Sequence, residues 1–300
     1  MNTRKQHFVW RKYLKSWSTN EQLYCLMTNR IFKTNLHGIA NIRDFYSFKP
    51  LEAKDFELIK NMFIINNSPE LKKINEKWLE IFQLTNLVQK INNCCGSIKE
   101  INDALINFGE KIHTKIESDS LKYLNQLLSG NTDFYNQDED YFNFNFFISA
   151  QFVRTNRNKQ IILQKMRKND DIDFENIWNV CNYIIATNMA FGLHSYKNKF
   201  KILKIINNTD VSFITGDQPV INTYAAMNLE QELINDIELY YPITPKMSIL
   251  ITQNDKYRTT KVIECDANIV NQFNSYIKYY SFEQLYANNS KDLECYISIN

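Results

Sequence analysis

The spacing of apolar residues changes character about two thirds of the way along the chain. From residue 51 to about residue 197, apolar positions recur every three or four residues, which is the period of amphipathic helices. From residue 198 to 265 they alternate with polar residues or form β-branched runs, a pattern that predicts strands. A last helix is predicted over 266–280. The pattern favours an α+β protein that is predominantly helical, with a small, mostly antiparallel sheet in the C-terminal third.

The first 50 residues predict a short helix followed by a β-hairpin. Apolar positions at helical spacing in Gln6–Trp17 give the helix an aromatic face. Two β-rich runs, Gln22–Met27 and Arg30–Lys33, predict the strands of an N-terminal hairpin. Because no linker or repeat interrupts the chain, we expect one domain over 1–300. Its parts are the N-terminal helix and hairpin (1–50), a helical part (51–197), and a part with the sheet and last helix (198–300).

Local signals predict several element boundaries. Ser68 followed by Pro69 predicts a helix start, with Ser as N-cap and Pro in the first turn. Ser97 predicts the start of another helix that runs towards Glu117. The run Val211–Ile214 predicts a buried strand, and Tyr241 with the prolines that follow predicts a strand end.

Composition narrows the class of protein. The chain is 44% hydrophobic over 300 residues, which supports a sizeable core, and its net charge of +2 neither demands nor excludes nucleic acid. Its six cysteines lack the spacing of a zinc site, so we expect reduced, packed thiols. The sequence has no apolar run of about 18 to 20 residues and no apolar leader at its start. We therefore expect a cytoplasmic protein without a membrane partner.

The first candidate for chemistry is Asp217. It lies between Gly216 and Pro219, two residues that end a strand, and a turn at a rigid strand end can present a carboxylate to a cleft. The alternative is that Asp217 only caps the turn through its own backbone, as Asp commonly does.

Further polar candidates lie elsewhere in the chain. Gln151 and Arg154 are three residues apart and share a helix face, and Arg154 with Arg157 can form a clamp for phosphate or carboxylate. The alternative for the two arginines is a surface position near a helix end. His7 is a candidate general acid–base, or a histidine bonded to backbone. Asn274 lies within the last predicted helix, where an Asn is favoured only if it forms hydrogen bonds.

Several catalytic motifs are missing from the sequence. It contains no Gly-rich phosphate loop, no GxSxG and no HExxH. Glu238 is not followed by a lysine where a two-metal nuclease has one. We therefore expect neither a metal nor another cofactor.

Taken in order along the chain, these segments resemble the bacterial family known as domain of unknown function 4238. The resemblance rests on His7-Phe8-Val9 with Tyr13, Leu14 and Trp17, on Gln151, Arg154 and Thr155, on Phe213–Val220, and on Pro242–Pro245. Trp10 departs from the family pattern, which has proline there. The resemblance implies that His7, Gln151, Arg154, Asp217 and Asn274 belong to one site. It supplies no reaction, and it associates the chain with genes of bacterial defence.

These observations favour a hydrolase that acts on nucleic acid, and within that class a DNA glycosylase that releases bases, including modified ones, in anti-phage defence. Asp217 would be the catalytic carboxylate, with His7 beside it. Substrate-binding roles fall to residues that read an extruded base or hold phosphate: Gln151, Arg154, Arg157, Gln218, Tyr241 and Asn274. The alternatives are a metal-dependent nuclease and a non-catalytic module that binds a ligand or protein in a defence system. The sequence defines no oligomeric state.

Overall fold

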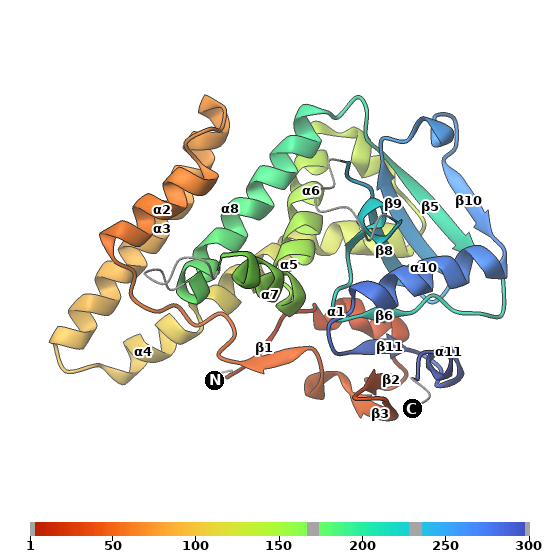
Figure 1. Ribbon diagram of the computed structural model, residues 1–300, viewed down its shortest axis with the longest axis horizontal. Coiled ribbons are helices and arrows are strands. Elements are labelled where there is room, and N and C mark those ends of the chain that lie inside the picture. Colours follow the sequence, from red (N-terminus) through yellow and green to blue (C-terminus); the bar gives the residue numbers. More distant parts are fainter. Residues whose placement is uncertain (1–3, 167–173, 228–235, 298–300) are drawn as a thin grey trace.

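Figure 1 shows the computed structural model of the protein, in which residues 4–166, 174–227 and 236–297 are described. Helices occupy the left and centre of this view, and strands lie at the right and along the bottom. The predicted α+β class, mostly helical with a sheet in the C-terminal part, is confirmed.

The centre of the molecule is a packed group of helices. Its main members are α5 (Phe108–Leu128), α6 (Asp138–Val153) and α8 (Phe174–Ser195). The shorter α7 (Asn156–Met166) contacts α6 and α8. At least half of the residues of α6 and of α8 are buried, because both helices are apolar around most of their circumference.

An arm of helices extends from this centre at the left of Figure 1. It consists of α2 (Ala53–Phe63), α3 (Pro69–Cys94) and α4 (Lys99–Ile106). The Ser68 side chain accepts a hydrogen bond from the Leu71 backbone N–H at 3.4 Å, which confirms the predicted start of α3.

The helix predicted from Ser97 towards Glu117 is wrong in its boundaries. Ser97 has a φ of +57° and lies in the turn before α4, so its side chain does not cap that helix. The chain then breaks at Asn107, and α5 begins at Phe108. The left-handed turn at Ser97 thus shifts the helix start by two residues, and the break at Asn107 divides the predicted helix into α4 and α5.

A five-stranded sheet lies to the right of the helices (Figure 1). Its strand order is β10-β5-β9-β8-β7, and only the β10–β5 pair is parallel. The bounds are Lys201–Asn207 for β5, Ile221–Asn222 for β7, Leu239–Thr244 for β8, Met247–Thr252 for β9 and Val262–Cys265 for β10.

Helix α10 (Ala267–Tyr280) packs against one face of this sheet. Asp266 caps it by accepting from the Ile269 backbone N–H, and the Phe273 ring stacks on Tyr240 at a centroid distance of 4.3 Å. On the opposite face of β8, Tyr241 packs into the helical core. Alternate residues of one strand thus serve two cores, as the pleat requires.

A second sheet joins the two ends of the chain. Its order is β3-β2-β11-β6, with β2 at Gln22–Met27, β3 at Arg30–Asn35, β6 at Thr215–Gly216 and β11 at Leu285–Ala287. The predicted hairpin is confirmed. Its two turn residues, Thr28 and Asn29, have φ values of 47° and 62°, the conformation that a two-residue hairpin turn of type I′ needs.

The strand predicted over Val211–Ile214 is wrong, since only Thr215–Gly216 belong to a strand. The segment is buried, but apart from the Phe213 N–H, which donates to the Pro245 carbonyl at 2.9 Å, its backbone groups bond to side chains instead of a strand ladder. The Trp17 indole donates to the Phe213 carbonyl at 2.9 Å, and the Ile214 N–H donates to Asn274 at 3.0 Å.

Two other boundaries differ from the prediction. Strand β8 does not end at Tyr241 but continues through Pro242 to Thr244. Proline is tolerated there because the neighbouring strand β7 pairs only as far as Tyr240, so the edge beside Pro242 needs no N–H donor. The helix α10 is also not the last element, because β11 and the short α11 (Lys291–Glu294) follow it.

The N-terminal segment forms less helix than predicted. His7 ends a short strand β1 (Lys5–His7), which pairs with β4 (Asn41–Arg43), and the helix α1 covers only Arg11–Leu14 before a 3₁₀ turn. The predicted aromatic face is buried all the same, with Tyr13 and Trp17 inside the core. Within the described ranges, no helix combines the length and apolarity needed to cross a membrane.

Candidate active-site cavity

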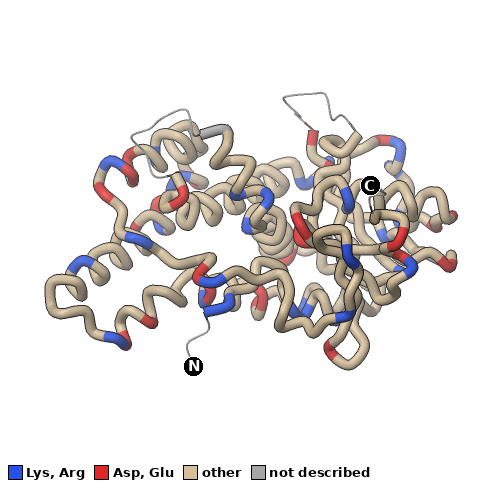
Figure 2. Tube along the Cα trace, turned by 60° about the horizontal axis from the view of Figure 1, so that its bottom comes forward, with Lys and Arg blue, Asp and Glu red and all other residues tan. Residues whose placement is uncertain are grey.

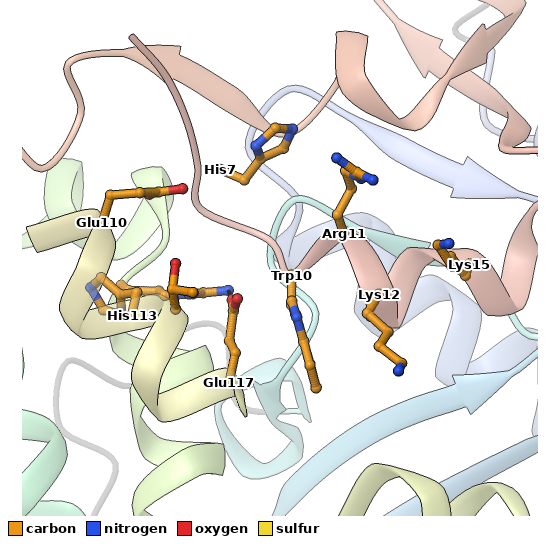
Figure 3. Close-up of a pocket in the computed structure, with 10 residues that line it drawn as sticks. His7, Trp10, Arg11, Lys12, Lys15, Glu110, His113 and Glu117 are labelled. Carbon is orange, nitrogen blue, oxygen red and sulfur yellow. Dashed lines mark hydrogen bonds and ion pairs between the residues drawn. The ribbon is translucent and has the colours of Figure 1, made fainter. Parts of the chain in front are cut away.

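A polar cavity of about 400 Å³ lies between α1 and the first half of α5. Figure 3 shows the acidic side chains and His113 on the α5 side and three cations on the α1 side, with Trp10 between them. The lining residues are His7, Trp10, Arg11, Lys12, Lys15, Glu110, His113, Thr114, Glu117 and Arg154.

Arg154 forms the inner wall of this cavity. It follows the last residue of α6, and its side chain is only 1% exposed. One nitrogen, Nη2, donates to Glu117 at 2.6 Å and to Gln151 Oε1 at 3.0 Å. Among the described residues, Nε and Nη1 have no hydrogen-bond partner. Burial disfavours the charged form, but Glu117 and other nearby groups keep the pKa of Arg154 above its ordinary value. The cavity wall therefore contains a fixed cation in which two guanidinium nitrogens, with three N–H groups between them, have no described partner.

Two carboxyl groups face the cavity from α5. Glu110 and Glu117 are two helical turns apart, so they lie on the same face of the helix. Burial raises the pKa of Glu110 from its ordinary 4.5 to about 7, while Arg154 opposes that shift and Glu117 adds to it. Burial also raises the pKa of Glu117, and the guanidinium of Arg154 opposes it. Since Arg154 stays protonated, the carboxylate beside it is held as an ion pair, and Glu110 is the group that titrates near neutral pH.

The free oxygen of Glu110 distinguishes it from the structural carboxylates. Its Oε2 atom is buried and has no partner among the residues that the structure describes. The backbone N–H of His7 forms a hydrogen bond with the carboxyl group. A carboxyl that is positioned at one oxygen and unoccupied at the other can pass a proton to a bound molecule.

The two histidines of the cavity are neutral. Burial, followed by the charge of Arg11, lowers the pKa of His7 to about 4, and its Nε2 atom is buried without a described partner. Burial holds the pKa of His113 well below its ordinary value. The His113 ring stacks against Tyr183 at 5.0 Å and against Tyr46 at 4.4 Å between centroids. His113 is thus part of the aromatic core, although both of its ring nitrogens, like Nε2 of His7, have no hydrogen-bond partner among the described residues.

The cavity mouth carries positive charge. Arg11, Lys12 and Lys15 follow one another along α1 and the 3₁₀ turn, and Lys12 and Lys15 are exposed. Lys15 forms an ion pair with Glu21 at 2.5 Å, and Arg11 contacts the His37 ring at 3.0 Å. Cations around an opening of this kind attract anionic ligands to it.

The structure brings together only part of the predicted site. His7 and Arg154 line the cavity, and Gln151 reaches it indirectly, as an acceptor for Arg154. Asp217 is not among the lining residues. Its two oxygens accept hydrogen bonds from the backbone N–H groups of Phe282, Glu283 and Gln284 at 2.7, 2.7 and 3.0 Å.

Asp217 therefore has a structural task in the loop between α10 and β11. Burial raises the pKa of Asp217 to about 6, although the three N–H donors favour its charged form. A catalytic role for this residue stays a prediction, and its hydrogen bonds account for its burial without one.

Three other predicted residues are engaged elsewhere. Gln218 donates to the carbonyls of Phe152 and Val220, and Asn274 holds the backbone of the 212–214 segment. Arg157 donates to the Tyr279 carbonyl at 2.8 Å and lies over the Tyr280 ring. The clamp of two arginines stays a prediction: Arg157 is held at the end of α10, and Arg154 is buried beside Glu117.

Tyr241 lies in the core close to the cavity. Its ring stacks on Tyr13 at a centroid distance of 4.8 Å, and its hydroxyl is buried without a described partner. Burial raises the pKa of Tyr241, and the positive charge of Arg154 opposes that shift. Tyr241 does not line the cavity in this structure.

The two cavity-lining carboxyl groups of α5, Glu110 and Glu117, were not predicted from the sequence as site residues. Glu110, His113 and Glu117 recur at helical spacing on an otherwise amphipathic helix, a polar stripe that the sequence displays. Its connection to Arg154 is not local, because 37 residues separate Glu117 from its partner. Within the described part of the chain, no three His, Cys, Asp or Glu side chains are grouped so that they could hold a metal ion.

The fold and the cavity define an α+β protein with a buried Arg–Glu pair and a titratable carboxyl at a basic opening. The chain belongs to the family described as protein of unknown function DUF4238, whose model matches residues 5–291. No curated protein and no solved structure was found to match the chain.

Proposed function

We propose that the protein is a hydrolase of the N-glycosidic bond in nucleic acid, and that the cavity between α1 and α5 is its active site. One observation carries the proposal. A half-buried carboxyl, Glu110, has a buried oxygen without a described partner and a pKa of about 7, and it faces a cavity with three cations at its mouth. Perturbed acids in a polar cavity are typical of active sites.

The two carboxyl groups suit two different tasks in this reaction. Glu110, in its protonated form, donates its proton to the leaving base as the bond from C1′ to the base nitrogen breaks. Glu117, as a carboxylate, stabilises the positive charge that develops on the sugar. Water then supplies a hydroxyl to C1′, and its remaining proton restores Glu110. Seven residues of helix separate the two groups by about 10.5 Å along the axis, which leaves room for a sugar between them.

The cations at the cavity mouth are the reason for proposing a substrate that carries phosphate. Arg11, Lys12 and Lys15 at the mouth suit the phosphates that flank a nucleotide. The two unpartnered nitrogens of Arg154 suit an acceptor on the base or sugar deeper in the cavity. We assign the catalytic carboxyl to Glu110 in preference to Asp217, since three backbone N–H groups already occupy the oxygens of Asp217.

The test is a search for a released base. The protein is incubated with phage DNA, bacterial DNA and single-stranded oligonucleotides, with and without EDTA, and mass spectrometry detects free bases. Glu110→Gln keeps the shape of the side chain but removes its proton, so we expect at least a hundredfold loss of base release. Glu80→Gln, at an exposed position of α3, is the matched control.

Three outcomes would contradict the proposal. Full activity of Glu110→Gln would remove Glu110 from the mechanism. Strand cleavage that EDTA abolishes, without any free base, would favour the metal-dependent nuclease. Tight binding of a nucleotide without any product would favour the non-catalytic binding module. Modified phage DNA belongs among the substrates because the family resemblance associates the chain with bacterial defence.

A further inference from the structure

A second and larger cavity lies at the other end of α5. We call it the basic groove. It has a volume of about 960 Å³ and runs between the 129–136 segment, the end of α8 and the paired strands β5 and β10. Five cations and one acid are among its lining residues: Lys197, Lys201, Lys204, Arg258, Lys261 and Asp133. Acidic and basic residues are interspersed over much of the chain (Figure 2), so this excess of cations is local.

Strand topology explains why these cations meet. Because β10 runs parallel to β5, the two strands begin at the same end of the sheet. The start of β5 provides Lys201 and Lys204, and the segment that leads into β10 provides Arg258 and Lys261. The Lys204 backbone N–H donates to the Lys261 carbonyl at 3.0 Å, which fixes the two segments side by side. Residues 57 positions apart in sequence thus contribute to one basic wall.

The cations of the groove are incompletely neutralised. Lys204 donates to the Gly130 carbonyl at 2.8 Å, and Lys197 forms an ion pair with the exposed Asp138. The side chains of Lys201, Arg258 and Lys261 make no hydrogen bond or ion pair with any other described residue. Gathering unpaired like charges costs free energy, which a bound polyanion offsets.

The remaining lining of the groove is suited to a nucleic-acid strand. Thr132, Asn131 and Thr260 provide neutral hydroxyl and amide groups of the kind that contact phosphates and sugars. Phe200, which is partly exposed, provides aromatic surface on which an unpaired base can stack. A duplex hides the faces of its bases, so aromatic surface in a concave groove favours a single strand.

We propose that the basic groove is a second nucleic-acid site that binds the phosphate backbone of single-stranded DNA or RNA. It is separate from the cavity of Glu110, because about 18 Å of helix lies between Glu117, at the edge of that cavity, and Ser129, at the edge of the groove. Binding there needs no reaction at Glu110, so the groove inference goes beyond the proposed function and is tested independently of it.

The experiment measures fluorescence anisotropy of labelled 20-mers in single-stranded DNA, single-stranded RNA and duplex forms. Sodium chloride is varied from 50 to 200 mM. The groove variant carries Lys201→Glu, Arg258→Glu and Lys261→Glu. Its charge-matched control carries Lys73→Glu, Lys77→Glu and Lys90→Glu, at exposed positions of α3. Thermal unfolding confirms that each variant folds, and a neutral version with three Gln substitutions serves as the second groove variant.

For the wild-type protein we expect a single strand to bind more tightly than the duplex. In the groove variant, Kd rises at least tenfold and the slope of log K against log salt falls by about 3. The α3 control stays within twofold of wild type. Preference for DNA or for RNA identifies the strand that the groove takes. The inference is overturned if the groove variant and the α3 control weaken binding equally, or if neither weakens it. It is also overturned if the duplex binds as tightly as the single strand.

Discussion

At the scale of single residues, the protein contains carboxyl groups with contrasting surroundings. Glu110 is half-buried and one of its oxygens has no described partner, Glu117 is paired with Arg154, and Asp217 accepts three backbone hydrogen bonds. The same functional group is therefore placed to transfer a proton, to hold a charge or to secure a loop. Substitutions that remove the charge of a carboxyl group but keep its shape can show which of these tasks it performs.

The rate of base release depends on pH through Glu110. As an acid, Glu110 acts only when protonated, and its pKa of about 7 sets the upper limit. We expect kcat/KM to stay level on the acid side and to fall as pH rises through about 7, measured between pH 5 and 9. A rate that instead rises through pH 7 would make Glu110 a base.

Stability depends on pH through the same residue. The folded-state pKa of Glu110 lies above its ordinary 4.5, so the folded protein binds more protons than the unfolded chain between pH 4.5 and about 7. The contribution of Glu110 to stability is thus fully present below pH 4.5 and is lost as pH rises through 7. We expect Glu110→Gln to gain stability relative to wild type from pH 5 to pH 8, by about 1.4 kcal/mol per unit of pKa shift at most. Urea unfolding at pH 5 and pH 8 measures the free energy of unfolding of both proteins. A difference between variant and wild type that is the same at the two pH values would refute the prediction.

Asp217→Asn is expected to destabilise the protein. The amide oxygen can keep part of the bonding to Phe282, Glu283 and Gln284, but the amide NH₂ turns a donor towards a backbone N–H. Loss of a charged acceptor in a buried site costs about 2 kcal/mol or more. The melting temperature and the activity per folded molecule are measured together. A variant that is stable but inactive would support the predicted catalytic role of Asp217.

At the scale of elements, helix α3 has an unusual distribution of polar and apolar residues. Asn75, Asn86 and Asn92 are buried, and they bond to Asn188 of α8, to Leu51 and to Asn102 of α4, whereas Leu84 and Ile91 are exposed. The buried asparagines bond to specific groups. Asn86 both accepts from the Leu51 N–H at 2.9 Å and donates to the Leu51 carbonyl at 2.8 Å. Hydrogen bonds, rather than apolar burial alone, therefore attach this helix.

Paired substitutions on α3 test that conclusion. Asn86→Ala leaves two buried backbone groups of Leu51 without partners and should lower the free energy of unfolding by about 2 to 3 kcal/mol. Leu84→Ala, at a side chain that is 63% exposed, should change it by less than about 0.5 kcal/mol. Chemical denaturation of both variants gives the comparison. Equal losses would show that α3 is held by its apolar face instead.

The success of sequence-based prediction also varied from element to element. The hairpin of β2 and β3, the cap of α3 at Ser68 and the strand β9 were predictable because neighbouring residues determine them. The 211–214 segment was not, because its backbone is satisfied by Trp17 and Asn274 from distant parts of the chain. Contacts between distant parts of the chain also explain why only part of the cavity was predicted. His7 and Arg154 were identified, but the pairing of Arg154 with Glu117 exists only in the fold.

At the scale of the whole molecule, two cavities lie at opposite ends of α5. The first combines an acid, a buried ion pair and a basic mouth, and the second is a basic groove without a comparable acid. Both are built by segments far apart in sequence around one long helix. A protein arranged in this way can contact a long substrate at two places while only one place carries reactive groups.

The sheet that joins the chain ends also constrains how the protein can be synthesised. Leu26 of the N-terminal hairpin pairs with Leu285, which the ribosome adds roughly 260 residues later. At about 5 to 20 residues per second, the open edge of β2 waits about 13 to 50 s for its partner strand. During that interval the hairpin presents unpaired backbone groups to other chains. Translation speed therefore sets how long each nascent chain is exposed to aggregation.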